Sequence, residues 1–188
     1  MMKLLLASQS ARRKELLQSL GYSFETVSIH CDEIFPEDMP VDNIAGYLSK
    51  IKADAYPNLQ EDEILLTADT IVALGNQVLG KPQTPEQAQA MLRSLSGKTH
   101  KVYTGITIRT LNQEITKTDM AEVTFSELSD AEIALYIQEY QPFDKAGSYG
   151  IQERIGMAKV SSISGSFYTI MGLPTHLVYE ELEKINPR

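Results

Sequence analysis

Two long strand patterns that follow each other in the second half of the chain constrain its fold more than any other feature. Residues 101–109 and residues 114–125 each fit one long strand, and the short connection Leu111-Asn112-Gln113 joins them. Strand patterns separated by so few residues favour antiparallel neighbours in a sheet. Elsewhere along the 188 residues, strand and helix patterns alternate. We therefore expect an α/β or α+β fold in which helices flank a mixed, twisted sheet with long antiparallel strands.

The remaining elements are predicted from hydrophobic periodicity and from residues that start or stop helices. Further strands are expected over residues 3–7, 24–29, 63–68 with a continuation over 70–74, 77–79, 157–163 and 167–170, and helices over residues 10–20, 41–55, 84–95, 129–141 and 174–184. Two helix starts carry a capping signal, in which a hydroxyl side chain caps the helix: Thr84-Pro85-Glu86-Gln87 and Ser129-Asp130-Ala131-Glu132. No repeat, low-complexity tract or long linker interrupts the sequence, so we expect one domain over residues 1–188.

The net charge limits which ligands fit the chain, and the cysteine content indicates its redox compartment. The net charge is −8, whereas generic nucleic-acid binding usually needs a broad basic surface. A single cysteine, Cys31, excludes an internal disulfide framework and suits a reducing compartment. The apolar run Leu4-Leu5-Leu6 is too short for a signal peptide, and no run of about 18 apolar residues is present. We expect a cytoplasmic protein that binds neither nucleic acid nor a membrane.

The segment Ser8-Gln9-Ser10-Ala11-Arg12-Arg13 connects the first predicted strand to the first predicted helix. A helix N-terminus has unpaired N–H groups and a partial positive charge, so it binds phosphate well. The two hydroxyls add donors, and the two arginines add planar groups that hold phosphate oxygens. Adjacent arginines in a first turn oppose the helix dipole unless an anion lies nearby. The spacing alone fits this site and a serine-capped surface helix with solvated arginines equally well.

Asp69 is the main candidate for a catalytic carboxylate. It directly follows the buried strand pattern over residues 64–68, and α/β proteins place ligands and metals at the carboxyl ends of strands. A divalent ion prefers such oxygen ligands and bridges them to substrate phosphates. The pair Asp32-Glu33 supplies a partner carboxylate after the second strand. The alternatives are a turn aspartate at position 69 and a solvated acidic pair at positions 32 and 33.

Three lysines are candidate phosphate ligands. Lys52 lies on the predicted second helix, Lys81 is fixed between a glycine and a proline, and Lys145 precedes an alanine–glycine pair. Each of them, taken alone, also fits a surface charge. The three histidines are isolated from one another in the sequence, and we interpret them as structural or exposed: His30, His100 and His176.

Taken together, these segments resemble the Maf family of nucleoside triphosphate pyrophosphatases. The matching segments keep the family's order along almost the whole chain: Leu6-Ala7-Ser8-Gln9-Ser10-Ala11-Arg12-Arg13, Asp32-Glu33, Lys50-Ile51-Lys52-Ala53, Ala68-Asp69-Thr70, Gly80-Lys81-Pro82, Leu95-Ser96-Gly97, Thr104-Gly105, Asp144-Lys145-Ala146-Gly147-Ser148-Tyr149-Gly150-Ile151-Gln152 and Met171-Gly172-Leu173-Pro174. Each segment alone is a weak signal, whereas nine in register are a strong one. The resemblance implies a Maf/ITPase-like sheet with two lobes around a cleft.

The resemblance also implies an activity that depends on Mg²⁺ or Mn²⁺. The family cleaves a nucleotide between its α- and β-phosphates, which gives a nucleoside monophosphate and pyrophosphate. Carried over to this sequence, Asp69 is the central catalytic carboxylate and Glu33 assists it, either of them as base or as metal ligand. The residues expected to bind the substrate are Ser8, Arg12, Arg13, Lys52, Thr70, Lys81 and Gln152. Such a reaction depends mainly on positioning and on neutralising phosphate charge, which a set of cations supplies.

The segments around the catalytic aspartate are similar to the branch of the family that acts on dTTP and UTP. In this branch Thr70 follows the aspartate, whereas the branch that acts on 7-methyl-GTP has glutamine there. The chain departs from the family at Ala11, where proline is common, and at Ser164-Gly165-Ser166, where an Asn-Gly pair is common. We expect a homodimeric dTTP and UTP pyrophosphatase that also acts on modified pyrimidine nucleotides in a housecleaning role.

A competing hypothesis is a nucleotide-binding regulator of septum formation and cell division, whose hydrolysis is incidental. The complete set of carboxylates and cations favours the enzyme, because a sensor does not need the carboxylates.

Overall fold

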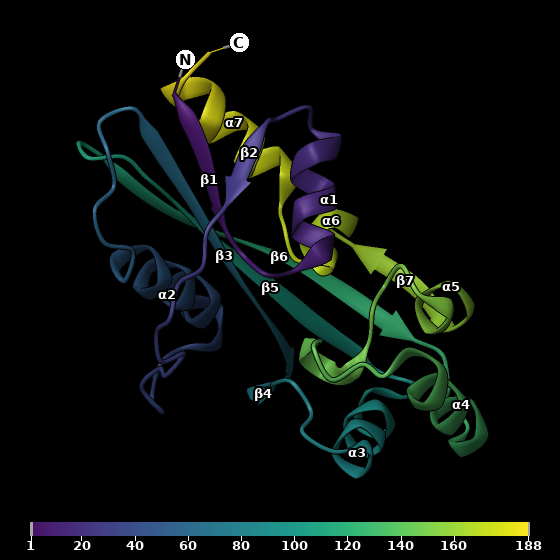
Figure 1. Cartoon of the computed structure of the whole chain (residues 1–188). Coiled ribbons are helices and arrows are strands. Elements are labelled where there is room, and N and C mark those ends of the chain that lie inside the picture. Colours follow the sequence, from purple (N-terminus) through teal and green to yellow (C-terminus); the bar gives the residue numbers. More distant parts are fainter. Residues whose placement is uncertain (1, 188) are drawn as a thin grey trace. The chain divides into compact units, whose positions relative to one another are not determined.

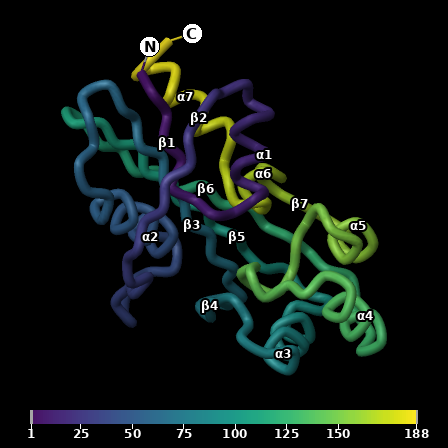
Figure 2. Tube along the Cα trace, in the orientation of Figure 1, coloured from purple at the N-terminus to yellow at the C-terminus, as the bar shows by residue number. Residues whose placement is uncertain are grey.

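The computed structural model describes residues 2–187, which divide into two compact units. Unit 1 contains Thr104–Asp119 and the described residues before Thr70 and after Met171, and unit 2 contains Thr70–Tyr103 and Met120–Met171. Three strands pass from one unit into the other, so each unit is assembled from segments far apart in the sequence. Figure 1 labels the helices and strands, and Figure 2 traces the chain through them.

The elements follow the predicted alternation of strands and helices. They are β1 (Lys3–Ala7), α1 (Ala11–Ser19), β2 (Phe24–Thr26), α2 (Val41–Asp54), β3 (Glu63–Leu74), β4 (Gln77–Leu79), α3 (Pro85–Leu95), β5 (Thr99–Arg109), β6 (Glu114–Phe125), α4 (Asp130–Tyr140), the 3₁₀ turn η1 (Ala146–Ser148), α5 (Arg154–Lys159), β7 (Val160–Ser164), α6 (Phe167–Met171) and α7 (Thr175–Ile185). The strands form one sheet in the order β2-β1-β3-β5-β6-β7, with β4 paired to β3. Strand β1 is parallel to β2 and β3, whereas the β3–β4 and β6–β7 pairs are antiparallel. The predicted mixed sheet flanked by helices is confirmed.

Unit 1 is built around the short apolar strand β1. Its residues Leu4, Leu5 and Leu6 are buried, as expected of a parallel strand with neighbours on both edges. The register with β3 runs from Lys3 opposite Glu63 to Ala7 opposite Thr67. Helix α2 approaches the sheet closely at Gly105, where a Cβ atom would lie 2.3 Å from the carbonyl of Ala45. This contact explains the glycine, because any side chain would collide with helix backbone.

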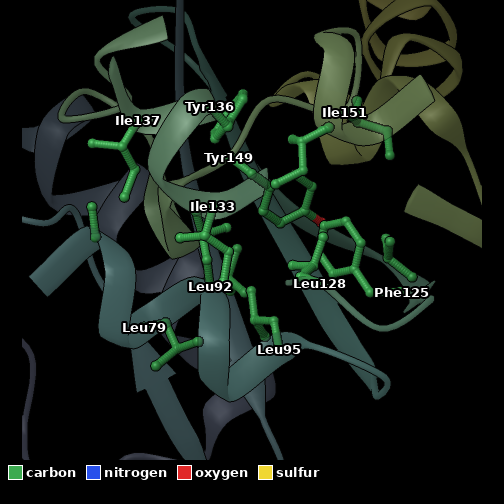
Figure 3. Packing of buried hydrophobic residues seen from close by; sticks show 14 of the residues in the cluster. Leu79, Leu92, Leu95, Phe125, Leu128, Ile133, Tyr136, Ile137, Tyr149 and Ile151 are labelled. Atoms are coloured by element: carbon green, nitrogen blue, oxygen red, sulfur yellow. The ribbon is translucent and has the colours of Figure 1, made fainter. Parts of the chain in front are cut away.

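Unit 2 has its own apolar core, which Figure 3 shows from close by. Leu92 and Leu95 of α3 are buried with Ile133 of α4 and Phe125 of β6. Both predicted capping signals are present at the starts of these helices. The hydroxyl of Thr84 accepts a hydrogen bond from the N–H of Gln87, and the hydroxyl of Ser129 accepts one from the N–H of Glu132, both at 3.3 Å. The carboxylate of Glu132 completes the capping box by accepting from the N–H of Ser129 at 2.9 Å.

Two strand predictions near the C-terminus need correction. Residues 157–159 of the predicted strand 157–163 belong to α5 instead, and only the following residues enter β7. The predicted strand 167–170 is the helix α6. Its aromatic and β-branched residues favour a strand, but glycines on both sides turn the backbone, since Gly165 has φ 110° and Gly172 has φ 109°. Among the described residues, no helix is both long and apolar enough to cross a membrane.

Candidate active site

The site in unit 1 begins where the ladder between β1 and β3 ends. The last paired residues are Ala7 and Thr67. The chain of β1 then turns at Ser8 into α1, whereas β3 continues through Asp69 to Leu74. Ser8 and Asp69 therefore follow the parallel ladder at the same end, which is the carboxyl end of β1, whereas Asp69 lies within β3. This is the position at which α/β proteins bind ligands.

The turn after β1 is folded around its two serines. The hydroxyl of Ser8 is buried and accepts from the N–H of Ser10 at 3.2 Å, while Ser10 caps α1 by accepting from the N–H of Arg13 at 3.5 Å. The guanidinium of Arg13 donates to Ser8 Oγ at 3.4 Å and to the carbonyl of Gly172 at 2.8 Å. Arg13 is thus held in place by the protein. The alternative of two solvated arginines is wrong for this residue.

Lys52 joins the two candidate carboxylates. Its Nζ forms ion pairs with Asp69 Oδ2 and with Glu33 Oε1, the latter at 2.9 Å. The side chains of Lys52 and Asp69 are 15% and 11% exposed, whereas that of Glu33 is 44% exposed. The Lys52–Asp69 pair is therefore shielded from water, which strengthens the attraction. Three residues from a helix, a strand and a loop meet at one point.

The turn and the carboxylates form one charged cluster. Burial lowers the pKa of the Arg13 guanidinium, and the neighbouring charges that act on it are those of Asp69, Arg12 and Glu33. The cluster thus contains three cations, on Arg12, Arg13 and Lys52, beside two carboxylates. Such a surplus of cations suits a polyanionic ligand such as a triphosphate.

Sequence reasoning missed one residue beside this cluster, Cys31. Burial raises the pKa of its thiol, and the surrounding charges include Lys52, Glu33 and Asp69. The only signal in the sequence is its place directly before Asp32-Glu33. A raised pKa disfavours the thiolate, which is the nucleophilic form of cysteine.

The carboxylates of Asp69 and Glu33 converge on one point, which the Lys52 ammonium fills. Within residues 2–187, no group of three His, Cys, Asp or Glu residues is placed to hold a metal ion. Mg²⁺ typically takes one or two carboxylates from a protein and completes its shell with water and substrate phosphates. Two carboxylates are thus a donor set that fits a divalent ion whose other ligands are water and substrate phosphates.

The other predicted substrate residues lie in unit 2. Thr70 is half-buried and opens this unit's part of β3, directly after Asp69. Lys81 is exposed, and the carbonyl of the preceding Gly80 accepts from the N–H of Gly147 at 3.1 Å. This hydrogen bond joins the motif Gly80-Lys81-Pro82 to the motif over residues 144–152, both of which match the family pattern. Gln152 carries a buried Oε1 that has no hydrogen-bond partner among the described residues.

A profile of the family described as Maf-like protein matches residues 3–185 of the chain. The chain belongs to this family. Relatives named dTTP/UTP pyrophosphatase are 49% identical in Bacteroides thetaiotaomicron, 48% in Phocaeicola vulgatus and 45% in Porphyromonas gingivalis, each over 185 residues. These matches cover 97%, 97% and 96% of this chain and 96%, 96% and 93% of the relatives. A solved structure of a HAM1 protein from Coxiella burnetii superposes with a TM-score of 0.43 and 17% identity over 66% of this chain and 73% of that chain.

Membership of the Maf-like family confirms the recognition made from the sequence, and the matched region contains every predicted site residue. In this Maf-like chain, unit 1 gathers six of them: Ser8, Arg12, Arg13, Glu33, Lys52 and Asp69. Unit 2 holds the other three: Thr70, Lys81 and Gln152. Sequence reasoning also missed Glu153 and Tyr136, whose side chains bond to each other although 17 residues separate them. A contact between a loop and a helix at that separation has no signature in a single sequence.

Proposed function

We propose that the chain is a nucleoside triphosphate pyrophosphatase, which hydrolyses dTTP and UTP to the monophosphate and pyrophosphate. The observation that carries the proposal is the charged cluster of unit 1, in which Lys52 bridges Asp69 and Glu33 beside Arg13. The names of the relatives that match almost the whole chain support the same reaction. A regulator that only senses a nucleotide does not require the two carboxylates, so the enzyme is the better account of the cluster.

The triphosphate binds at the turn after β1. The N-terminus of α1 supplies N–H groups, Ser8 supplies a hydroxyl, and the arginines supply guanidinium groups. Arg13 is already fixed by Ser8 and Gly172, so binding costs little of its side-chain entropy. Lys52 adds a third cation from α2. In unit 2, Lys81 is the exposed lysine of the segment tied to Gly147, and we assign it to phosphate binding.

Asp69 and Glu33 would hold a divalent cation, Mg²⁺ or Mn²⁺, when the nucleotide brings it. The cation would neutralise charge on the phosphates and polarise the bond that breaks. In its absence the ammonium of Lys52 compensates both carboxylates. Because a lysine side chain is long and flexible, Lys52 can exchange its carboxylate partners for phosphate oxygens.

Hydrolysis at the α-phosphorus then follows from the positions of these groups. A water oxygen forms a bond to the α-phosphorus, and the bond from that phosphorus to the oxygen bridging to the β-phosphate breaks. The carboxylate of Asp69 orients the water and accepts its proton. Pyrophosphate leaves with the bonding electron pair, and the arginine and lysine cations stabilise the charge that develops on it.

The unpaired amide oxygen of Gln152 supports a uracil or thymine base. A buried acceptor without a donor costs about 1–3 kcal/mol, which a ligand donor would recover. Uracil and thymine carry an N–H at ring position 3, whereas cytosine has an acceptor there. We assign Gln152 to this contact and Thr70 to the same substrate.

Pyrophosphate release from a panel of dTTP, UTP, CTP and 7-methyl-GTP with Mg²⁺ tests the proposal. We expect turnover of dTTP and UTP above that of the other two, and no turnover of any of the four would refute it. Asp69→Asn should abolish turnover while a titration still detects UTP binding, because the cations bind the phosphates and Asp69 performs the chemistry. Loss of binding together with turnover would instead show that Asp69 is needed to hold the nucleotide, and it would contradict the separation of binding from chemistry.

The remaining expectations belong to the same proposal. We propose that the enzyme acts as a homodimer in the cytoplasm and also accepts modified pyrimidine nucleotides. Light scattering coupled to size exclusion tests the dimer, and a monomeric mass over the assay range of concentrations contradicts it.

A further inference from the structure

One buried ionic group in unit 2 has no role in the reaction described above. Lys145, in the segment that leads to Gln152, is 8% exposed. Its Nζ lies 2.8 Å from Asp144 Oδ1 and 3.2 Å from Glu153 Oε1. The side chain of Asp144 is 63% exposed, whereas that of Glu153 is only 15% exposed. Glu153 is therefore the stronger electrostatic partner of this ammonium, since water screens the exposed carboxylate of Asp144.

The second oxygen of Glu153 connects the ion pair to helix α4. Glu153 Oε2 accepts a short hydrogen bond from the hydroxyl of Tyr136, and this hydroxyl accepts from the N–H of Gly150 at 3.0 Å. Tyr136 is itself 3% exposed and shares its apolar cluster with Tyr149 and Ile151, as Figure 3 shows. The carboxylate of Glu153 thus holds Lys145 directly, and it holds Gly150 through the hydroxyl of Tyr136.

The segment has little room to adopt another position. A Cβ atom on Gly150 would lie 2.7 Å from the carboxyl carbon of Glu153, so the backbone rests directly on this carboxylate. A Cβ atom on Gly156 would lie 2.0 Å from the carbonyl oxygen of Ile151. Contacts from two sides therefore enclose the backbone on the N-terminal side of Gln152, whose Oε1 has no partner among the described residues.

We propose that Glu153 and Tyr136 are positioning residues, which hold the turn that presents Gln152 to the pyrimidine base. This inference rests on the proposed function. The two residues touch no substrate and act through the N–H of Gly150 and the ammonium of Lys145. Removing the Tyr136 hydroxyl leaves a buried N–H and a buried carboxylate oxygen without a partner, so the turn relaxes and the acceptor of Gln152 moves.

The test compares Tyr136→Phe with Tyr140→Phe. Tyr140 lies on the same helix and stacks on Tyr136 with ring centroids 5.0 Å apart, but its hydroxyl has no hydrogen bond among the described residues. We expect Tyr136→Phe to raise KM for UTP about tenfold, with kcat within a factor of two. The preference for UTP over CTP in kcat/KM should fall by a similar factor. Tyr140→Phe should leave both quantities unchanged.

Glu153→Gln is the second variant, and it keeps the inference testable if Tyr136→Phe does not fold. It keeps the shape of the side chain and an acceptor for Tyr136, but it removes the charge that Lys145 needs. We expect an equal or larger loss of UTP preference, and partial recovery in Glu153→Asp, which restores the charge. All constants are measured below the lowest melting temperature of the set, which a thermal melt of each variant provides.

The outcomes separate this inference from the proposed function. If the unmodified protein releases no pyrophosphate from UTP, the proposed function fails and this inference fails with it. If the unmodified protein is active and both Tyr136→Phe and Glu153→Gln lower the melting temperature without changing the preference for UTP over CTP, the residues are merely structural and only the positioning role is overturned.

Discussion

His100 should make the stability of the protein depend on pH in a calculable way. The ring is 1% exposed and its Nε2 lies 2.7 Å from the hydroxyl of Tyr149, while its Nδ1 has no partner among the described residues. Burial lowers the pKa of His100 from 6.5 to about 4. The unfolded chain therefore binds a proton that the folded protein resists. Stability is complete above pH 6.5, falls as the pH drops below it, and reaches its minimum below pH 4.

The size of the effect follows from the two pKa values. A separation of about 2.5 pH units corresponds to about 3 kcal/mol of unfolding free energy between neutral pH and pH values below 4. At pH 5 about 2 kcal/mol of this is already lost. Because the pKa of His100 in the folded protein is about 4, the loss of stability occurs over a pH range that is accessible without strong acid.

Urea unfolding at pH 7.5 and pH 5.0 measures this loss. His100→Gln keeps a polar group near Tyr149 but does not titrate, so it should lose about 2 kcal/mol less than the unmodified protein between the two pH values. The matched control is His176→Gln, which replaces a histidine whose side chain is 53% exposed. This variant should leave the pH dependence of the unfolding free energy unchanged. Equal losses in the unmodified protein and in His100→Gln would refute the reasoning.

Three further predictions concern the site and the folding of unit 2. Lys52→Gln should lower kcat/KM for UTP about 100-fold or more, because it removes a cation from the phosphates, whereas Lys50→Gln on the exposed face of α2 should change it less than twofold; equal effects would contradict the assignment. Chelation of divalent ions should abolish pyrophosphate release and added Mg²⁺ should restore it, and full activity in excess chelator would contradict the proposed metal dependence. Ser129→Ala should lower the free energy of unfolding by about 1 kcal/mol through loss of the helix cap, and an unchanged urea midpoint would contradict that role.

Elements with strong local signals were predictable from the sequence. The apolar run of β1 and the capping box at Ser129 depend on neighbouring residues only, and both are present as predicted. The helix α6 was predicted as a strand because its aromatic and β-branched residues carry a strand preference. Its conformation depends instead on the positive φ angles of Gly165 and Gly172, which no periodicity reveals.

The candidate site was predictable as a set of residues but not as a geometry. Sequence motifs singled out Lys52 and Asp69 separately, whereas their ion pair depends on how α2 packs beside β3. The carbonyl of Gly172, which fixes Arg13, lies 159 residues away from it along the chain. Backbone atoms carry no side-chain signature, so a contact of this kind cannot be inferred from residue types.

The close contact between Gly150 and Glu153 also restricts how this sequence can diverge. Space for the carboxylate exists only because residue 150 lacks a side chain, so a mutation at either position changes what the other tolerates. Gly150→Ala should be harmful beside Glu153 and much milder beside Glu153→Ala, which removes the colliding group. Among relatives, the two positions should therefore change together or remain unchanged, and their substitutions should show strong epistasis rather than additive effects.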